Sequence, residues 1–289
     1  MAFAFWLRWS WRDLRRRLFQ VIAIAAIVAL GSGLYAGLAS TSMWRKKSLD
    51  TTFSRLAAHD IDVSATAGLS GPASRLLNAV RSSGGTGISA AASRLVADLP
   101  VRAGNDGRVP AAGVIVGVDV SQPVTIDRWR VTAGTSIGPT DANRDVVLLD
   151  EHFARAHHLP ASGTVVIAGR PVRYTGTALE PEYLNTTTTF GATIQGAATR
   201  AVIYAPIALV QELAGLAGQA NDVVVRVRAG DNVEQVAARL SAALPKSLPD
   251  LALTVTIRTS DPSTRALYDE ISSEQSVFDV FAVLILAGA

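Results

Sequence analysis

The sequence contains no cysteine among its 289 residues. This absence excludes disulfide bonds and thiolate metal sites, so the chain must fold through packing alone. A phosphate-binding G-x-x-x-x-G-K-[ST] loop is also absent, and the glycine-rich stretch 83–87 has no lysine that could reach a phosphate. We expect that stretch to be a loop.

Residues that could carry catalysis or bind metal are scarce. His152, His157 and His158 form a histidine cluster, but a spacing of five residues does not align His152 and His157 on one helix face. Glu180 and Glu182 flank a proline, and paired carboxylates can serve glycosidase chemistry. Their closeness in sequence, without a cleft signature, favours a solvated loop instead. We therefore predict no enzymatic activity and no catalytic, cofactor-binding or metal-binding residues.

The net positive charge of the chain comes from its N-terminal region. Residues 1–40 contain five arginines and one aspartate, whereas residues 41–275 contain 22 basic and 22 acidic side chains. A nucleic-acid-binding domain needs a basic surface that attracts phosphate. The bulk of this chain has no net charge, which argues against a nucleic-acid partner.

A long apolar run follows the basic leader. Leu18–Ala39 is a stretch of 22 residues without a charged side chain. As a helix it would be about 33 Å long, which is enough to cross a hydrocarbon core of about 30 Å. We predict a transmembrane helix over 18–40. A cleaved signal peptide is the alternative, although the run is long for one and no clean A-x-A site follows it.

The basic residues around this run predict its orientation. Five arginines precede it within residues 8–17, and Arg45, Lys46 and Lys47 follow it. The excess on the N-terminal side favours a cytoplasmic N-terminus. Residues 1–17 form an amphipathic pattern, with arginines on one side of a helix and apolar residues on the other. This leader is either a simple topogenic charge cluster or a docking surface for a partner.

Residues 41–275 alternate short strand and helix patterns, which predicts an α+β extracytoplasmic domain with two lobes. Residues 42–56 would extend the first helix beyond the membrane. Asp231, with Glu234 three residues later, is expected to cap a helix that ends before Pro245. The pattern Asn185-Thr186-Thr187 matches a glycosylation acceptor, and we interpret 186–190 as a surface loop. The predicted strands are Asp60–Thr66, Ala112–Val118, Val146–Leu149, a hairpin of Thr164–Ala168 with Val172–Thr177, Ala201–Tyr204, Asp222–Arg228 and Leu251–Arg258; the predicted helices include Pro72–Ser82, Glu151–His158 and Pro206–Leu216.

The end of the sequence suggests a second span. Asp261-Pro262 has the N-cap and first-turn residues of a helix, which would form a stalk leading into an apolar segment. Val277–Ala289 is apolar except for Asp279, but its 13 residues are fewer than a crossing needs. We therefore expect residues 276–289 to begin a second transmembrane helix of a longer protein.

Three segments resemble a known family. The leader and span, LRWSWRDLRRRLFQVIAIAAIVALGSGLYAGL, resemble the start of FtsX/MacB-type ABC transporter permeases. SLDTTFSRLAAHDIDVSA is similar to the family's entry into its MacB-like periplasmic core domain. GVDV at 117–120 and DVVLLDEHFARAHHLPASGTVVIAGRPVRYTGTA at 145–178 resemble a strand, short helix and hairpin of that domain, although many members have Gly-Asp where this chain has Ser162-Gly163-Thr164.

The resemblance implies a permease subunit in the cell membrane that works with a separate ABC-type ATPase. Members typically couple ATP hydrolysis to movement of the extracytoplasmic domain, a mechanism called mechanotransmission, in export or in lipid or lipoprotein extraction. Expected partners are the ATPase, a second permease copy or homologue, the lipid bilayer, and an extracytoplasmic protein or lipid-linked substrate. The alternative is a membrane-anchored extracytoplasmic sensor or binding module.

Overall fold

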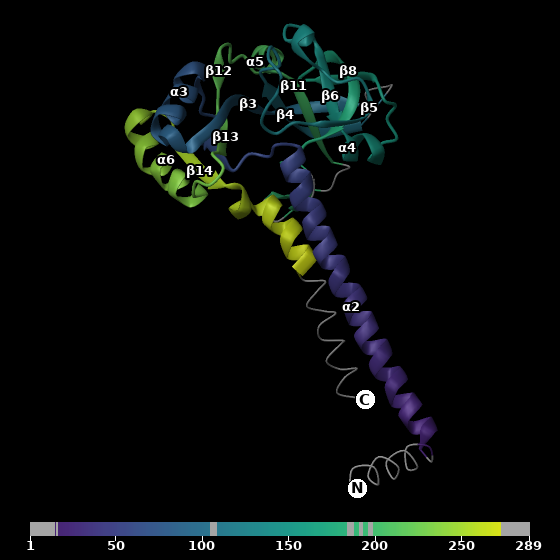
Figure 1. The fold of residues 1–289 in the computed structure, drawn as a ribbon. Coiled ribbons are helices and arrows are strands. Elements are labelled where there is room, and N and C mark those ends of the chain that lie inside the picture. The colour runs from purple at the N-terminus through teal and green to yellow at the C-terminus, as the bar shows by residue number, and fades with distance from the viewer. Residues whose placement is uncertain are drawn as a thin grey trace. The chain divides into compact units, whose positions relative to one another are not determined.

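A computed structural model describes residues 15, 17–104, 109–183, 188–190, 193–195 and 199–272 (Figure 1). The chain divides into two compact units, one of residues 1–51 with 266–289 and one of residues 52–265. The leader, apart from Arg15 and Arg17, the segment 276–289 and the pattern at 185–187 lie outside the described residues.

The first unit is helical where it is described. Helix α2 (Leu18–Arg55) continues for 38 residues, which confirms the helical extension expected over 42–56 as far as residue 55. A second helix begins at 262 and is described as far as 272. Within this unit Arg45 Nη2 lies 3.5 Å from Glu270 Oε1, and the Tyr268 hydroxyl donates a hydrogen bond to Asp50.

In the part of the chain that the structure describes, no helix has the combined length and apolar character needed to span a membrane.

The second unit is built on one continuous ten-stranded sheet. Its strands run in the order β14-β1-β13-β3-β4-β11-β6-β8-β5, with β7 paired to β3 and β8. Two short two-stranded pairs, β9 with β10 and β2 with β12, lie outside this sheet. The strands are β1 (Ile61–Ala65), β2 (Gly71–Pro72), β3 (Ile88–Ala103), β4 (Val109–Val118), β5 (Arg130–Gly134), β6 (Val146–Asp150), β7 (Gly163–Ile167), β8 (Arg170–Leu179), β9 (Thr188–Phe190), β10 (Thr193–Gln195), β11 (Arg200–Pro206), β12 (Gln219–Ala220), β13 (Asp222–Val227) and β14 (Leu253–Ile257).

The helices of this unit cover the sheet in two places. Helix α3 (Ala73–Gly84) packs on β3 and β13, and α6 (Val233–Ser247) packs on α3 and β14. Together with β1 they enclose one apolar core (Figure 1). Helices α4 (Glu151–Ala156) and α5 (Ile207–Ala214) contribute Phe153, Leu209 and Val210 to another core, built on β4, β6, β7, β8 and β11. The sheet is continuous, so the expected two lobes correspond to divided apolar packing rather than to separate sheets.

The long strand β3 belongs to both halves. Ala91 is buried in the core under α3 and α6, and Leu95 is buried in the core under α4 and α5. Successive side chains of a strand point to opposite faces, so Arg94 and Val96 face the other way. Val96 packs against a third core, which contains Val116 and Tyr204 and is closed by the segment 119–142. Arg94 therefore points into the covered, non-helical face of the sheet.

Most predicted strands and helices are confirmed, but β3 and β5 were not predicted, and β9 lies within the stretch 186–190 that was expected to be a loop. Residues 83–87, also expected to be a loop, form the end of α3 and a 3-10 turn. The sequence pattern placed the hairpin turn at Gly169-Arg170, but the turn is Ala168-Gly169, and both residues have the positive φ angles of a type I′ turn. Asn232, not Asp231, caps α6, because its side chain accepts a hydrogen bond from the Gln235 N–H. That helix also continues through Pro245 to Ser247.

Candidate functional site: a buried charge network

Arg94 is the centre of a charge network buried in the second unit. Only 3% of its surface is exposed. Its Nε and Nη2 atoms lie 2.6 and 2.5 Å from Oδ2 of Asp222, its cross-strand neighbour on β13. Its Nη1 lies 2.7 Å from Glu182 Oε2 and 3.4 Å from Asp127 Oδ2. One guanidinium thus holds three carboxylates that come from distant parts of the chain.

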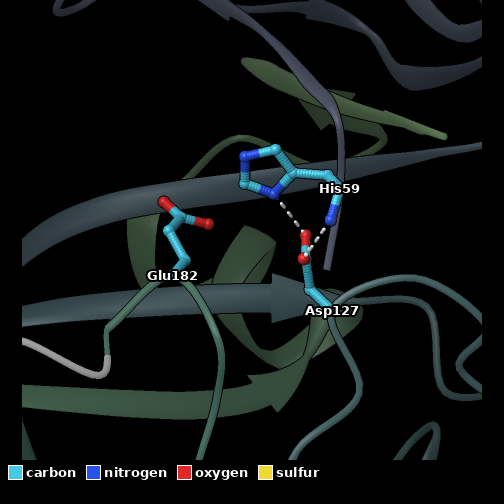
Figure 2. A group of neighbouring side chains, drawn as sticks. All are labelled: His59, Asp127 and Glu182. Carbon is cyan, nitrogen blue, oxygen red and sulfur yellow. Dashed lines mark hydrogen bonds and ion pairs between the residues drawn. The ribbon is translucent and has the colours of Figure 1, made fainter. Parts of the chain in front are cut away.

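His59 and Asp127 form a pair beside this arginine (Figure 2). The Asp127 carboxylate accepts the His59 backbone N–H at 2.8 Å and lies 2.9 Å from the ring Nδ1. Their two segments are also joined through the backbone, since the N–H groups of Asp127 and Arg128 donate to the carbonyls of Ala57 and Leu56. Asp127 has a positive φ of 50°, a conformation that aspartate tolerates better than most residues.

The prediction that Glu180 and Glu182 lie in a solvated loop is wrong. Glu180 is 2% exposed, and neither of its carboxylate oxygens has a hydrogen-bond partner among the described residues. Glu182 is half-buried and pairs with Arg94. Figure 2 shows the Glu182 carboxylate directed toward the His59 ring. The two glutamates follow β8 directly, so the end of this strand delivers them to the interior rather than to solvent.

Asp62 and Asp222 form an acidic pair on the same face of the sheet. Asp62 is opposite Val224 in the β1–β13 register, which places Asp222 diagonally across from it. Both have one buried carboxylate oxygen that accepts no hydrogen bond within the described structure. Burial, together with the charge and hydrogen bonding of Asp222, raises the pKa of Asp62 to about 10. A proton on Asp62 lets it donate to Asp222 and removes the repulsion between them.

Protonation balances the remaining charges of the network. Burial lowers the pKa of His59, but the neighbouring Asp127 carboxylate outweighs it, and the net pKa is raised. Burial alone would raise the pKa of Asp127, yet His59 and Arg94 bring it below its ordinary value. Burial, reinforced by Asp127 and Glu182, raises the pKa of Glu180 well above the usual range. The shifts thus favour the neutral forms of Asp62 and Glu180 and the ionised forms of His59 and Asp127.

Three of these side chains have the donor types of a metal site. The His59 ring nitrogen, an Asp127 oxygen and a Glu182 oxygen all lie within 4.8 Å of one another. Imidazole and carboxylates are ordinary ligands of zinc and other transition metals. However, Arg94 already lies against both carboxylates, and Asp127 already engages the His59 nitrogen. The Arg94 guanidinium supplies positive charge at this place, and the raised pKa of His59 favours a second positive charge beside it.

The histidines singled out in the sequence are not part of this network. His152 lies 3.3 Å from Asp150 Oδ2, and that hydrogen bond raises its pKa. The His157 ring contacts Phe153 at a centroid distance of 4.7 Å. No sequence motif marks His59, Arg94 or Asp222. The one available signal was that ionisable residues interrupt apolar strand patterns at Asp62 and Arg94.

Comparisons with known proteins give one family match and several similar solved structures. The family model described as the MacB-like periplasmic core domain matches residues 21–243. The extracellular domain of the noncanonic ABC-type transporter YknZ from Gram-positive bacteria is 12% identical, with a TM-score of 0.44, over 68% of this chain and 98% of that one. The periplasmic region of MacB from Actinobacillus actinomycetemcomitans is 13% identical, with a TM-score of 0.48, over 76% and 95%. A search of curated protein sequences finds no match.

The mixed α/β domain is therefore of the extracytoplasmic type found in permease components of ABC transporters. The chain belongs to the MacB-like periplasmic core domain family, since the matched segment covers well over half of it. This confirms the resemblance noted in the sequence.

Proposed function

We propose that this chain is the permease subunit of an ABC transporter complex, anchored in the cell membrane with its N-terminus in the cytoplasm. ATP hydrolysis by a separate subunit moves its extracytoplasmic domain, which drives export or lipid and lipoprotein extraction. The family match over 21–243 is the observation that carries this proposal. The missing phosphate-binding motif supports assigning ATP hydrolysis to a partner.

Arg258 lies between the end of α2, the start of the helix at 262 and the segment that contains His59. Its contacts with these segments support a coupling role. Its guanidinium lies 4.7 Å from the centre of the Phe53 ring, in the last residues of α2. Its Nε donates to the His59 carbonyl at 2.9 Å, and its backbone N–H donates to the Asp60 carbonyl. Three residues later, Asp261 caps the helix that begins at 262. A displacement of either helix would therefore act first on the segment that contains His59.

The experiment is to purify the full chain from its native membrane with an affinity tag and measure ATP turnover. We expect vanadate-sensitive turnover in the complex and none from the isolated chain. Charge reversal at Arg12, Arg15 and Arg16 should weaken this association if the leader is the docking surface. Insertion of that variant in the original orientation must be confirmed first, because those arginines also orient the chain. ATP turnover by the isolated chain would contradict the assignment.

A further inference from the structure

Residues 119–129, which connect β4 to β5, form a segment without helix or strand that covers part of the non-helical face of the sheet. We call this segment the strap. Its buried apolar side chains are Val120 and Ile126, and Trp129 stacks on Tyr204 with ring centroids 6.2 Å apart. A cavity of about 230 Å³ remains between residues 122–127 and strands β3, β4, β11 and β13. The strap is therefore incompletely packed, so it can move at a lower cost than a strand of the core.

Hydrogen bonds fasten one end of the strap to the residues that follow α2. The Asp127 N–H donates to the Ala57 carbonyl at 3.0 Å. The Arg128 N–H donates to the Leu56 carbonyl at 2.7 Å. The Asp127 carboxylate accepts the His59 backbone N–H at 2.8 Å and lies 2.9 Å from its ring Nδ1 (Figure 2). Because α2 ends at residue 55, these bonds make the strap follow a movement of that helix end.

The backbone of this junction is strained on both sides. Ala57 has a φ of 53° and Asp127 has a φ of 50°, both in the left-handed region. Residues other than glycine adopt this region at a cost, and the cost is larger for alanine than for aspartate. Such a conformation persists only while surrounding contacts hold it, and the strain is released when they separate. The junction therefore has the character of a two-state element, either fastened or released.

We propose that the strap is a lid opened by α2: movement of the helix end draws residues 125–129 away from the sheet and uncovers the apolar surface beneath them. This inference rests on the proposed function, since ATP hydrolysis by the partner subunit supplies the movement. The uncovered surface includes Val116, Val118 and Tyr204, of which Val116 and Tyr204 are buried while the strap is in place. A displacement of a helix is thereby converted into transient exposure of an apolar face.

Cysteine accessibility tests the proposal in the full chain, which has no native cysteine. Val116→Cys reports on the surface under the strap, and Val223→Cys reports on the core under α3 and α6; the two valines are 1% and 0% exposed. The reagent is methyl methanethiosulfonate, and intact mass gives its rate of addition. In nanodiscs that hold the chain with its ATPase, we expect ATP turnover to accelerate labelling of Val116→Cys at least about tenfold and to leave Val223→Cys unchanged.

Variants that cut the junction test the strap without ATP. Asp127→Ala removes both bonds to His59, so Val116→Cys should react faster in that background. Asp119→Ala is the matched control, because the Asp119 carboxylate bonds to Ser121 within the strap. Faster labelling of Val223→Cys would reveal loss of the fold instead of opening of the strap. In that case Arg128→Ala provides a milder cut, since it removes only the bond from the exposed guanidinium to the carbonyl of residue 55.

The outcomes separate this proposal from the proposed function. If ATP is hydrolysed while Val116→Cys reacts at the same rate with and without ATP, the lid is overturned and the proposed function stands. If no ATPase accompanies the chain, the proposed function fails, and the junction variants decide the role of the strap. Equal labelling of Val116→Cys in the Asp127→Ala, Arg128→Ala and Asp119→Ala backgrounds would then overturn it.

Discussion

Arg94 shows how one residue can hold a buried charge network together. Its guanidinium faces Asp222, Glu182 and Asp127, which lie on three separate segments. Five acidic side chains surround one arginine and one histidine in this interior. A buried carboxylate without a compensating charge or hydrogen bond is strongly unfavourable. The arginine is therefore required even though the network as a whole need not be a large source of stability.

We expect Arg94→Met to destabilise the folded chain by about 3–5 kcal/mol, because three buried carboxylates lose their shared cation. The measurement is urea unfolding followed by circular dichroism. Arg75→Met is the matched control, since it removes an exposed arginine that pairs with Asp250 at the surface. Equal midpoints for the two variants would contradict a structural role for Arg94.

Asp62 should make the stability of the chain depend on pH. Its folded-state pKa of about 10 lies above the ordinary value of 3.8, so folding favours the protonated form. This contribution is complete below about pH 4 and is lost as the pH rises toward 10. Asp62→Asn keeps a donor toward Asp222 but cannot ionise. The variant should therefore exceed the original chain in melting temperature at about pH 9, and the gap should shrink at about pH 5.

Thermal unfolding across this pH range checks the prediction. His59 also has a raised pKa and loses stabilisation as the pH rises, but it is present in both proteins and cancels in the comparison. Asp231→Asn, an exposed substitution, controls for the general effect of removing one negative charge. A gap between Asp62→Asn and the original chain that stays constant with pH would contradict proton sharing with Asp222.

At the scale of elements, patterns with clear periodicity were predictable and interrupted ones were not. The apolar alternation of β1 and β13 and the hairpin of β7 and β8 could be identified from sequence, although the turn of the hairpin lies one residue earlier than predicted. Strand β3 was missed, although it is the longest in the sheet, with 16 residues. The apolar alternation of β3 is interrupted by small alanines and by Arg94, Asp98 and Pro100. Arg94 is buried only because folding brings Asp222 beside it, and a sequence pattern does not reveal such a partner.

The buried site was unpredictable for the same physical reason. Glu180 and Glu182 follow a strand and flank a proline, which locally indicates an exposed loop. Their burial depends on Arg94 from β3 and on the segment 119–129, neither of which is near them in sequence. Patterns along the chain report local structure, whereas this network is defined by contacts between distant residues, such as Arg94 and Asp222, which are 128 positions apart.

The N-terminal cap of α6 can be tested directly. Asn232→Ala removes the acceptor for the Gln235 N–H and should destabilise the chain by about 1 kcal/mol. Asp231→Ala, at the neighbouring position expected from the sequence pattern, should have a smaller effect. Chemical unfolding of both variants gives the comparison. A larger loss of unfolding free energy for Asp231→Ala than for Asn232→Ala would show that Asp231 is the cap, as predicted from sequence.

At the scale of the whole molecule, the excess of basic residues before the apolar run predicts how the chain is oriented in the membrane. The chain has no native cysteine, so single cysteines can be introduced without background. We expect an impermeant maleimide on intact cells to label Ser121→Cys, which is exposed after β4, but not Ala2→Cys. After membrane disruption both should react. Labelling of Ala2→Cys alone in intact cells would mean that the chain has the opposite orientation.

The position of β3 also has a consequence for how the chain folds. Its first half pairs with β13, which lies more than a hundred residues later, and its second half pairs with β4, the next strand along the chain. Pairings between distant segments slow folding, because a long loop must close before any contact forms. The first half of β3 therefore stays without its β13 partner until residues 222–227 have emerged during synthesis. For a domain that folds outside the cytoplasm, this interval leaves an unpaired strand edge exposed to aggregation, and it gives folding factors on that side of the membrane a substrate.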